Sequence, residues 1–296
     1  MSAAKPGAAA HARRQLAFPA LFVLLWSTGF IAAKYGLPYA PPLTFLLYRF
    51  ALVAALMLVV ALATGATWPD EARQVAHIAI AAWLVHGIYL GGVFLSLAAG
   101  MAAGISAMLV GLQPILTALI ARAWLSERVV PRQWLGLVLG LAGVWLVVRG
   151  KASFSGDHAA LLPSALALVG ISVGTLYQKR YCARVDMRSG AVIQFCACAL
   201  LYLPLVLLFE GAPVRWTHEF IFAIGWSVVV LSVGAISLLY WLLRHGAAAN
   251  VARLFFLVPA VTAVEAWLMF GETLDALAVA GMVLIAVGVA LARPPR

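Results

Sequence analysis

Three charged side chains interrupt otherwise apolar stretches of this sequence: Arg49, Arg253 and Glu265. A charge inside a hydrocarbon environment is costly unless it is paired or hydrated, so such residues usually serve a function. Arg49 and Glu265 are predicted about two helical turns from the same end of their stretches, where they either pair or face one water-filled vestibule. There Arg49 suits a carboxylate, and Glu265 suits a proton or an amine. The alternative for Arg49 is a guanidinium that reaches the membrane surface and caps a loop.

Arg253 and His86 leave two interpretations open. Arg253 lies about two turns from the opposite end of its stretch, where it either faces an anionic group of a bound molecule or contacts neighbouring backbone at a gate. His86 and Tyr89 are one helical turn apart and therefore share a face. His86 could exchange protons near neutral pH, although a neutral, hydrogen-bonded core histidine is the commoner outcome.

An aromatic, an amide and two prolines complete the candidate site. Trp26 is expected near the middle of the membrane, beside a run of small residues, where it would line a cavity. Gln113 would add a polar contact. Pro114 and Pro259 are predicted in the middle of helices, where proline removes a backbone donor and frees carbonyl groups for a ligand or a hinge. A purely structural kink is the alternative.

The composition decides the environment in which these residues act. Of 296 residues, 65% are hydrophobic and 10% are charged, and the mean hydropathy is +1.03. A soluble domain needs far more polar surface, so the sequence predicts an all-α integral membrane protein. Continuous hydrophobicity without alternation favours helices. Ten transmembrane helices are expected near residues 16–37, 43–63, 74–97, 101–122, 131–149, 160–180, 189–209, 217–241, 246–269 and 275–292.

The chain resembles itself at a constant offset of 145 residues, without a gap. Ser27, Gly29 and Lys34 recur as Ser172, Gly174 and Lys179; Leu112, Pro114, Thr117 and Ala118 recur as Leu257, Pro259, Thr262 and Ala263; Glu127, Gly136 and Gly143 recur as Glu272, Gly281 and Gly288. We expect a short cytoplasmic N-terminal tail over residues 1–15, disordered over 1–12, a first repeat over 16–150 and a second over 160–292. Arg49, Arg253 and Glu265 have uncharged counterparts, so the symmetry is broken where charge occurs.

The distribution of basic residues predicts the orientation. Fourteen Lys and Arg fall on the side of the termini, four fall on the other side, and Arg49 and Arg253 lie inside spans. This bias places both termini in the cytoplasm. Because five helices per repeat is an odd number, the second repeat enters from the opposite face. Two inverted five-helix repeats interconvert readily between two states, each open to one side of the membrane.

Several motifs resemble the drug/metabolite transporter superfamily, and within it the EamA-domain family. The resemblance rests on Leu25-Trp26-Ser27-Thr28-Gly29-Phe30-Ile31 with Lys34, on Tyr48-Arg49-Phe50, on Pro114, Leu125-Ser126-Glu127-Arg128, Gly136 and Gly143, and on Pro259, Phe270-Gly271-Glu272-Thr273, Gly281 and Gly288. It implies export or exchange of small metabolites, often amino acids. It also implies a cavity lined by the first four helices of each repeat, with the fifth and tenth outside.

These observations lead us to expect a secondary transporter of the bacterial inner membrane that works by alternating access, with possible proton coupling. We expect a small-molecule substrate and a lipid bilayer as partners, no nucleic acid, no cofactor, no metal, and either a monomer or a homodimer. Multidrug efflux of lipophilic cations is the alternative within transport. A membrane enzyme acting on lipid-linked substrates is disfavoured, because the sequence lacks a catalytic motif and clustered acids or histidines at one interface.

Overall fold

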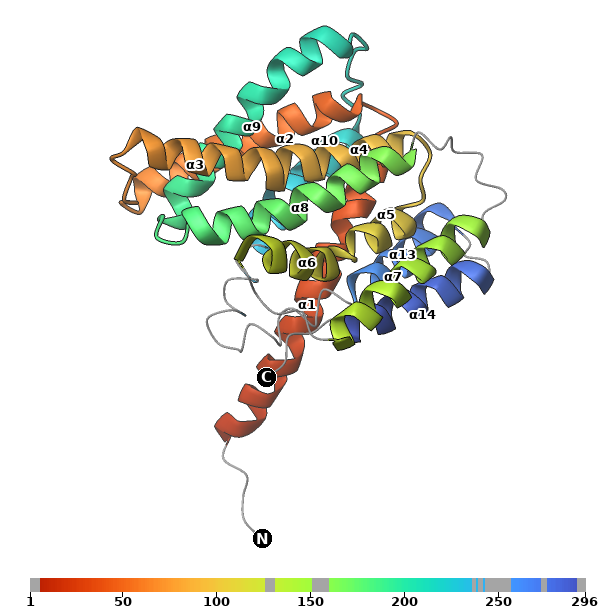
Figure 1. The fold of residues 1–296 in the computed structure, drawn as a ribbon. Coiled ribbons are helices and arrows are strands. Elements are labelled where there is room, and N and C mark those ends of the chain that lie inside the picture. The colour runs from red at the N-terminus through yellow and green to blue at the C-terminus, as the bar shows by residue number, and fades with distance from the viewer. Residues whose placement is uncertain are drawn as a thin grey trace.

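The described part of the chain is helical throughout, and none of its residues forms a strand (Figure 1). The computed structural model describes residues 6–125, 131–150, 160–235, 238, 242, 257–272 and 276–291. The first half consists of α1 (Pro6–Gly36), α2 (Pro42–Ala63), α3 (Ala72–Ala82), the π-helix η1 (Trp83–Ile88), α4 (Tyr89–Ala98), α5 (Ala103–Val110), α6 (Gln113–Leu125) and α7 (Pro131–Gly150). The second half consists of α8 (Leu161–Tyr181), α9 (Met187–Phe209), α10 (His218–Gly225), the π-helix η3 (Trp226–Ala235), α13 (Val258–Phe270) and α14 (Ala276–Leu291).

Six helices are long and apolar enough to cross a membrane by themselves: 17–36, 42–63, 72–98, 161–181, 187–209 and 218–235. Four shorter apolar helices, at 103–117, 134–143, 258–270 and 279–288, coincide with the other predicted spans. The chain is thus an all-α integral membrane protein, and this arrangement is compatible with ten spans.

Two local predictions from the sequence are wrong. The helix α1 already begins at Pro6, within the predicted disordered tail, and Gly111–Leu112 separate α5 from α6 within the span expected at 101–122.

The third helix of each half contains a π-helical segment at an equivalent place. The segment η1 continues directly from α3 into α4, and η3 continues directly from α10. The offset of 145 residues maps the start of η1 onto position 228, which lies inside η3. A π-helix widens the backbone and rotates the following side chains, and such segments are frequent at functional sites. The two wide turns are therefore the elements to examine for a site.

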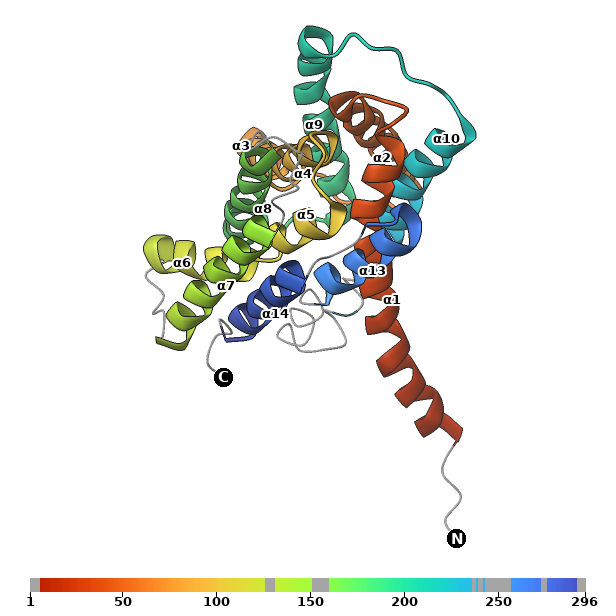
Figure 2. The same ribbon diagram turned by 90° about the vertical axis from the view of Figure 1, so that its right-hand side faces the viewer.

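The helices α7 and α14 pack against each other through glycines, side by side in both views (Figures 1 and 2). A Cβ atom on Gly143 would lie 2.7 Å from the carbonyl oxygen of Gly281, and one on Gly288 would lie 2.5 Å from that of Gly136. Gly143 and Gly288 are repeat counterparts, and so are Gly136 and Gly281. The same backbone contact is therefore made twice, once from each repeat. Small residues allow this close approach in a membrane, where van der Waals packing drives helix association.

The helices α2 and α9 also pack together and are joined by side-chain hydrogen bonds at both ends. At one end, the Glu210 carboxylate after α9 accepts hydrogen bonds from the backbone N–H groups of Leu43 (2.9 Å) and Thr44 (2.6 Å) and from the Thr44 hydroxyl (2.8 Å). These N–H groups lie in the first turn of α2 and have no partner within that helix. An acid from the second repeat therefore caps a helix of the first repeat.

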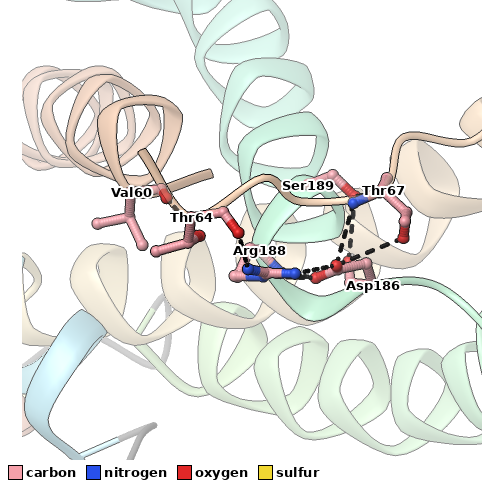
Figure 3. Close-up of polar contacts among 6 residues, drawn as sticks. All are labelled: Val60, Thr64, Thr67, Asp186, Arg188 and Ser189. Atoms are coloured by element: carbon pink, nitrogen blue, oxygen red, sulfur yellow. Dashed lines mark hydrogen bonds and ion pairs between the residues drawn. The ribbon is translucent and has the colours of Figure 1, made fainter. Parts of the chain in front are cut away.

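The other end has a matching cluster, in which the start of α9 binds the loop after α2 (Figure 3). Arg188 donates from Nη1 to the Thr64 carbonyl oxygen (2.9 Å) and from Nη2 to Asp186 (2.6 Å), and Ser189 donates to the Thr67 carbonyl oxygen (2.6 Å). The hydrogen bonds from the Arg188 side chain and backbone lower the pKa of Asp186, so this carboxylate stays charged at neutral pH. Ser189 is the repeat counterpart of Thr44. Both ends of the α2–α9 pair are thus fixed by equivalent positions.

We expect Gly143→Ala and Gly288→Ala each to lower the melting temperature of the purified protein, because the added methyl group meets backbone atoms that cannot move aside. Overpacking of this kind costs about 1–3 kcal/mol. Melting followed by tryptophan fluorescence in one detergent measures the effect. Gly225→Ala is the matched control, since nothing lies within 4 Å of its added Cβ. Equal melting temperatures for all three variants would refute close packing of α7 on α14.

Candidate functional site

A cavity of about 140 Å³ lies among α1, α2, η1, α4, α8 and η3. Its walls contain both wide turns of the fold, and contributions come from both halves of the chain. The described residues that line it are Trp26, Gly29, Phe30, Arg49, Val85, His86, Tyr89, Leu90, Val93, Phe94, Ile171, Leu231 and Ala235. Four side chains singled out from the sequence are among them: Trp26, Arg49, His86 and Tyr89. The lining is mostly apolar with a few polar groups, as in small-molecule sites generally.

Arg49 provides the charge of this cavity. Its side chain lies on α2 and is 8% exposed, and its Nε atom is buried without a hydrogen-bond partner among the described residues. No ion pair joins it to a described acid. A guanidinium without a counter-charge is costly in an apolar setting. A group that accepts hydrogen bonds and carries negative charge is the partner that suits such a guanidinium.

His86 and Tyr89 reach the same cavity from η1 and the start of α4. The His86 Nε2 atom lies 3.3 Å from Gln194 Oε1 on α9, and its ring stacks on Phe195 with centroids 4.8 Å apart. Gln194 is the repeat counterpart of Arg49, so equivalent positions on α2 and α9 both point toward the histidine region. The wide turn η1 and the Phe195 ring together fix the orientation of His86. Neither contact was evident from the sequence, because both depend on how α3, η1 and α9 pack.

Glu265 does not pair with Arg49 in this structure. Its Oε1 accepts a hydrogen bond of 2.8 Å from Ser27, a residue of α1 that is completely buried and directly follows Trp26. Its Oε2 is buried and has no partner among the described residues. Glu265 lies on α13, outside the cavity lining, so Ser27 is the link between this acid and the cavity wall. One free carboxylate oxygen leaves room for a proton.

Gln113, Pro114 and Pro259 lie away from the cavity lining. The expectation that both prolines lie in the middle of a helix is wrong. Pro114 and Pro259 are the second residues of α6 and α13, in first turns where proline needs no N–H partner. A Cβ on Gly111 would lie 3.1 Å from Pro259, so the break between α5 and α6 packs against the start of α13. Arg253 lies outside the described residues.

An ion pair that the sequence did not predict joins the ends of three helices. Lys34, near the end of α1, pairs with Glu272, which follows α13. Glu272 also accepts a hydrogen bond of 3.2 Å from the backbone N–H of Ala103, the first residue of α5. The Lys34 ammonium lies 5.0 Å from the centre of the Phe270 ring. The side chains of Lys34 and Glu272 are 32% and 11% exposed, so the pair is partly shielded from water.

The repeats, the membrane-spanning helices and the central cavity together define a membrane transporter. The EamA-like transporter family matches residues 16–149 and 159–293, once for each repeat. The chain belongs to this family and thus to the drug/metabolite transporter superfamily.

Relatives of similar length share this organisation. The chain is 28% identical over 288 residues to the "Uncharacterized transporter YvbV" of Bacillus subtilis, covering 92% of this chain and 89% of that protein. It is 28% identical over 296 residues to the "Probable amino-acid metabolite efflux pump" of Salmonella typhimurium, covering 90% and 91%. It is 24% identical over 260 residues to the "Uncharacterized inner membrane transporter YedA" of Escherichia coli, covering 87% and 84%.

A solved crystal structure has the same fold. It superposes with a TM-score of 0.65 at 22% identity and covers 93% of this chain and 94% of the other chain. The two proteins therefore share their helical fold although their sequences are only distantly related.

We expect Lys34→Gln and Glu272→Gln each to lower the melting temperature, and the double variant to lose less than the two losses added together. For a partly exposed pair the coupling should be about 1 kcal/mol or less. The exchanged pair, K34E with E272K, should recover only part of the loss, because lysine at position 272 cannot accept from the Ala103 N–H. Lys179→Gln is the control, since this counterpart of Lys34 is exposed and forms no ion pair with a described residue. Strict additivity would show that the pair contributes nothing.

Proposed function

We propose that this protein is a secondary transporter of the bacterial inner membrane that moves small amphipathic metabolites bearing a carboxylate, by export or exchange. Amino acids and closely related compounds are the nearest class. The substrate crosses by alternating access and is not chemically changed. The observation that carries this proposal is the Arg49 guanidinium, buried at the cavity and without an anionic partner among the described residues.

A substrate carboxylate would supply what Arg49 lacks. The planar guanidinium binds a carboxylate through two parallel hydrogen bonds, which are among the strongest in proteins. Tyr89 adds a hydroxyl, and His86 adds a ring nitrogen at the same cavity. The printed name of the Salmonella relative, an amino-acid metabolite efflux pump, supports a substrate of this kind.

Lipophilic cations are the second candidate class, because aromatic rings line part of the cavity. Trp26, Phe30 and Phe94 would offer apolar surface and cation–π contacts to such a molecule. Arg49 opposes it, since a second positive charge in the same apolar volume would be repelled. The Arg49 experiment below decides between the two classes.

The end of the bundle that carries Lys34 is closed in this conformation. Phe45, Phe94 and Phe220 pack against one another there with centroids 5.0 and 5.7 Å apart, and each is at most 1% exposed. The Lys34–Glu272 pair holds α1, α13 and α5 together at the same end. The excess of basic residues on the side of the termini supports assigning this end to the outside. In our proposal, opening this end releases the substrate.

Glu265 is the proposed site of proton coupling. It is an acid of one repeat, hydrogen-bonded to Ser27 of the other, and α1 packs against α13. Among the side chains that the structure describes, the other titratable or charged groups here are Lys34 and Tyr35 on α1 and Glu272 just after α13, with none on α5. Protonation of Glu265 would remove its charge and change the contact between the halves. This would link a proton to the change between states.

We expect Arg49→Gln to lower carboxylate transport about 10-fold or more in proteoliposomes, because each hydrogen bond to a charged group contributes about 1.5–3 kcal/mol. Arg49→Lys should keep the charge but lose the bidentate geometry, giving an intermediate rate. The assay uses labelled leucine, phenylalanine, their 2-oxo acids and tetraphenylphosphonium. Arg73→Gln, which removes an exposed charge on α3, is the control. Undiminished carboxylate transport by Arg49→Gln, or transport of the cation alone, would overturn the proposal.

We expect Glu265→Gln to transport the same carboxylates at a rate that no longer responds to an imposed pH gradient. The wild-type protein should respond several-fold, because its free carboxylate oxygen can take up and release a proton. Initial rates with and without the gradient measure the difference, and Glu71→Gln, an exposed acid beside α3, is the control. A variant that keeps the full pH response would remove Glu265 from the coupling mechanism.

A further inference from the structure

The repeat register applies to the cavity itself. Trp26 and Ile171 are counterparts at the 145-residue offset, and so are His86 and Leu231, and Leu90 and Ala235. All six of these residues line the cavity. Equivalent positions of the two repeats therefore line one cavity. The residues that each repeat contributes can be compared position by position.

The lining residues from the two repeats differ in chemistry. The first repeat supplies every aromatic and ionisable residue among the described lining: Trp26, Phe30, Arg49, His86, Tyr89 and Phe94. The second repeat supplies only aliphatic side chains, from Ile171, Leu231 and Ala235. The second-repeat residue that corresponds to Arg49 is Gln194, which contacts His86 and is not part of the lining. All ionisable side chains of the described lining thus come from the first repeat, and the second repeat adds aliphatic side chains alone.

We infer that the aliphatic side chains of the second repeat hold part of the substrate's tail, and that Leu231 and Ala235 limit the size of this tail. The inference rests on the proposed function, in which Arg49 binds the carboxylate. The rest of a molecule bound in this way occupies the remainder of the cavity. Ile171, Leu231 and Ala235 line that cavity and offer no polar group.

The charge of the lining narrows the substrate class further. Among the described residues that line the cavity there is one cation and no acid. Glu265, an acid within an apolar stretch of the sequence, is engaged by Ser27 and does not line the cavity. An ammonium group bound here would lose its water without gaining a counter-charge. The preferred substrate is therefore a monocarboxylate with a neutral aliphatic tail, such as a branched 2-oxo acid, over the corresponding zwitterionic amino acid.

The volume of the cavity gives the scale of the tail that it can hold. The volume of about 140 Å³ is close to that of an engineered protein cavity of roughly 150 Å³ that accommodates benzene. Leu231 is 7% exposed and Ala235 is 1% exposed, so both side chains are well packed. Leu231 also lies 3.7 Å from the position that a Cβ on Gly29 would take, so η3 packs close to α1 at the cavity.

Competition assays in proteoliposomes test this inference with the full-length protein. The probes are the 2-oxo acids that carry methyl, isobutyl and benzyl tails, together with alanine, leucine and phenylalanine. The wild-type protein should prefer the isobutyl oxo acid to leucine and to the benzyl oxo acid. One methylene more or less in an apolar pocket changes specificity by roughly 10- to 200-fold, so we expect Leu231→Ala to shift the benzyl-to-isobutyl ratio about 10-fold toward benzyl.

Two further variants make the result decisive. Ala235→Val should shift preference in the opposite direction, toward the methyl tail, and it retains the test if Leu231→Ala does not fold. Leu207→Ala removes the same atoms from a side chain that is 75% exposed, so it should leave every ratio unchanged.

The outcomes separate the inference from the proposal on which it rests. Equal ratios for Leu231→Ala, Ala235→Val and Leu207→Ala would overturn the tail pocket, even if transport still depended on Arg49. Preference for leucine over its oxo acid would overturn the inferred preference for monocarboxylates over amino acids, and would leave the tail pocket standing. If no carboxylate is transported by the wild-type protein, the proposed function itself fails.

Discussion

A guanidinium that lies inside a membrane-embedded cavity without a counter-charge among the described residues is the constraint on which this structure depends. In hydrocarbon, Arg49 would have to leave the membrane interior, lose its charge or find a partner. The fold instead surrounds it with a small cavity that adds a tyrosine hydroxyl and a histidine ring. Such a site is stable when it contains water or an anion, and a bound anion gains more because it also neutralises the charge. Binding energy is therefore concentrated at one residue.

In the proposed mechanism, the rest of the fold keeps this cavity in place while its halves move. The α7–α14 pair, with its two equivalent glycine contacts, packs backbone against backbone and contacts α5 and α6. The α2–α9 pair carries Arg49 on one helix and Gln194 on the other, and its ends are fixed by Glu210 and by the Asp186–Arg188 cluster. Hydrogen bonds at both ends oppose sliding of these two helices. The helices α1 and α13 also pack together, and the polar contacts described between them and the residues that follow α13 are Ser27–Glu265 and Lys34–Glu272. Both polar contacts can be broken when the acid is protonated or when water hydrates the charged groups.

The fold was largely predictable from the sequence, because hydrophobic stretches of membrane length and a constant repeat offset leave few architectures open. Trp26, Arg49, His86 and Tyr89 were identified from residue type and position, and they meet at one cavity because the repeat brings the first three helices around its centre. The positions of Pro114 and Pro259 were wrong, since helix boundaries in apolar segments depend on packing more than on hydropathy. The contacts of Glu265 with Ser27 and of Lys34 with Glu272 could not be predicted, because each joins residues 238 apart in different repeats. The π-helical turns have no sequence signal of their own.

The positions at which the two repeats carry the same residue differ in role from those at which they carry different residues. Equivalent residues make the contacts of the frame, as Gly143 and Gly288 do, and each such contact serves both states of a transporter because inversion exchanges one repeat for the other. A bound substrate has no such symmetry. It has one charged end and one apolar end, so the residues that the two repeats contribute to its cavity must differ if it is to bind in one orientation. Position 26 differs from position 171, and position 86 from position 231, because each pair combines an aromatic residue with an aliphatic one. Duplication can therefore preserve the moving frame while divergence at a few paired positions changes what is carried.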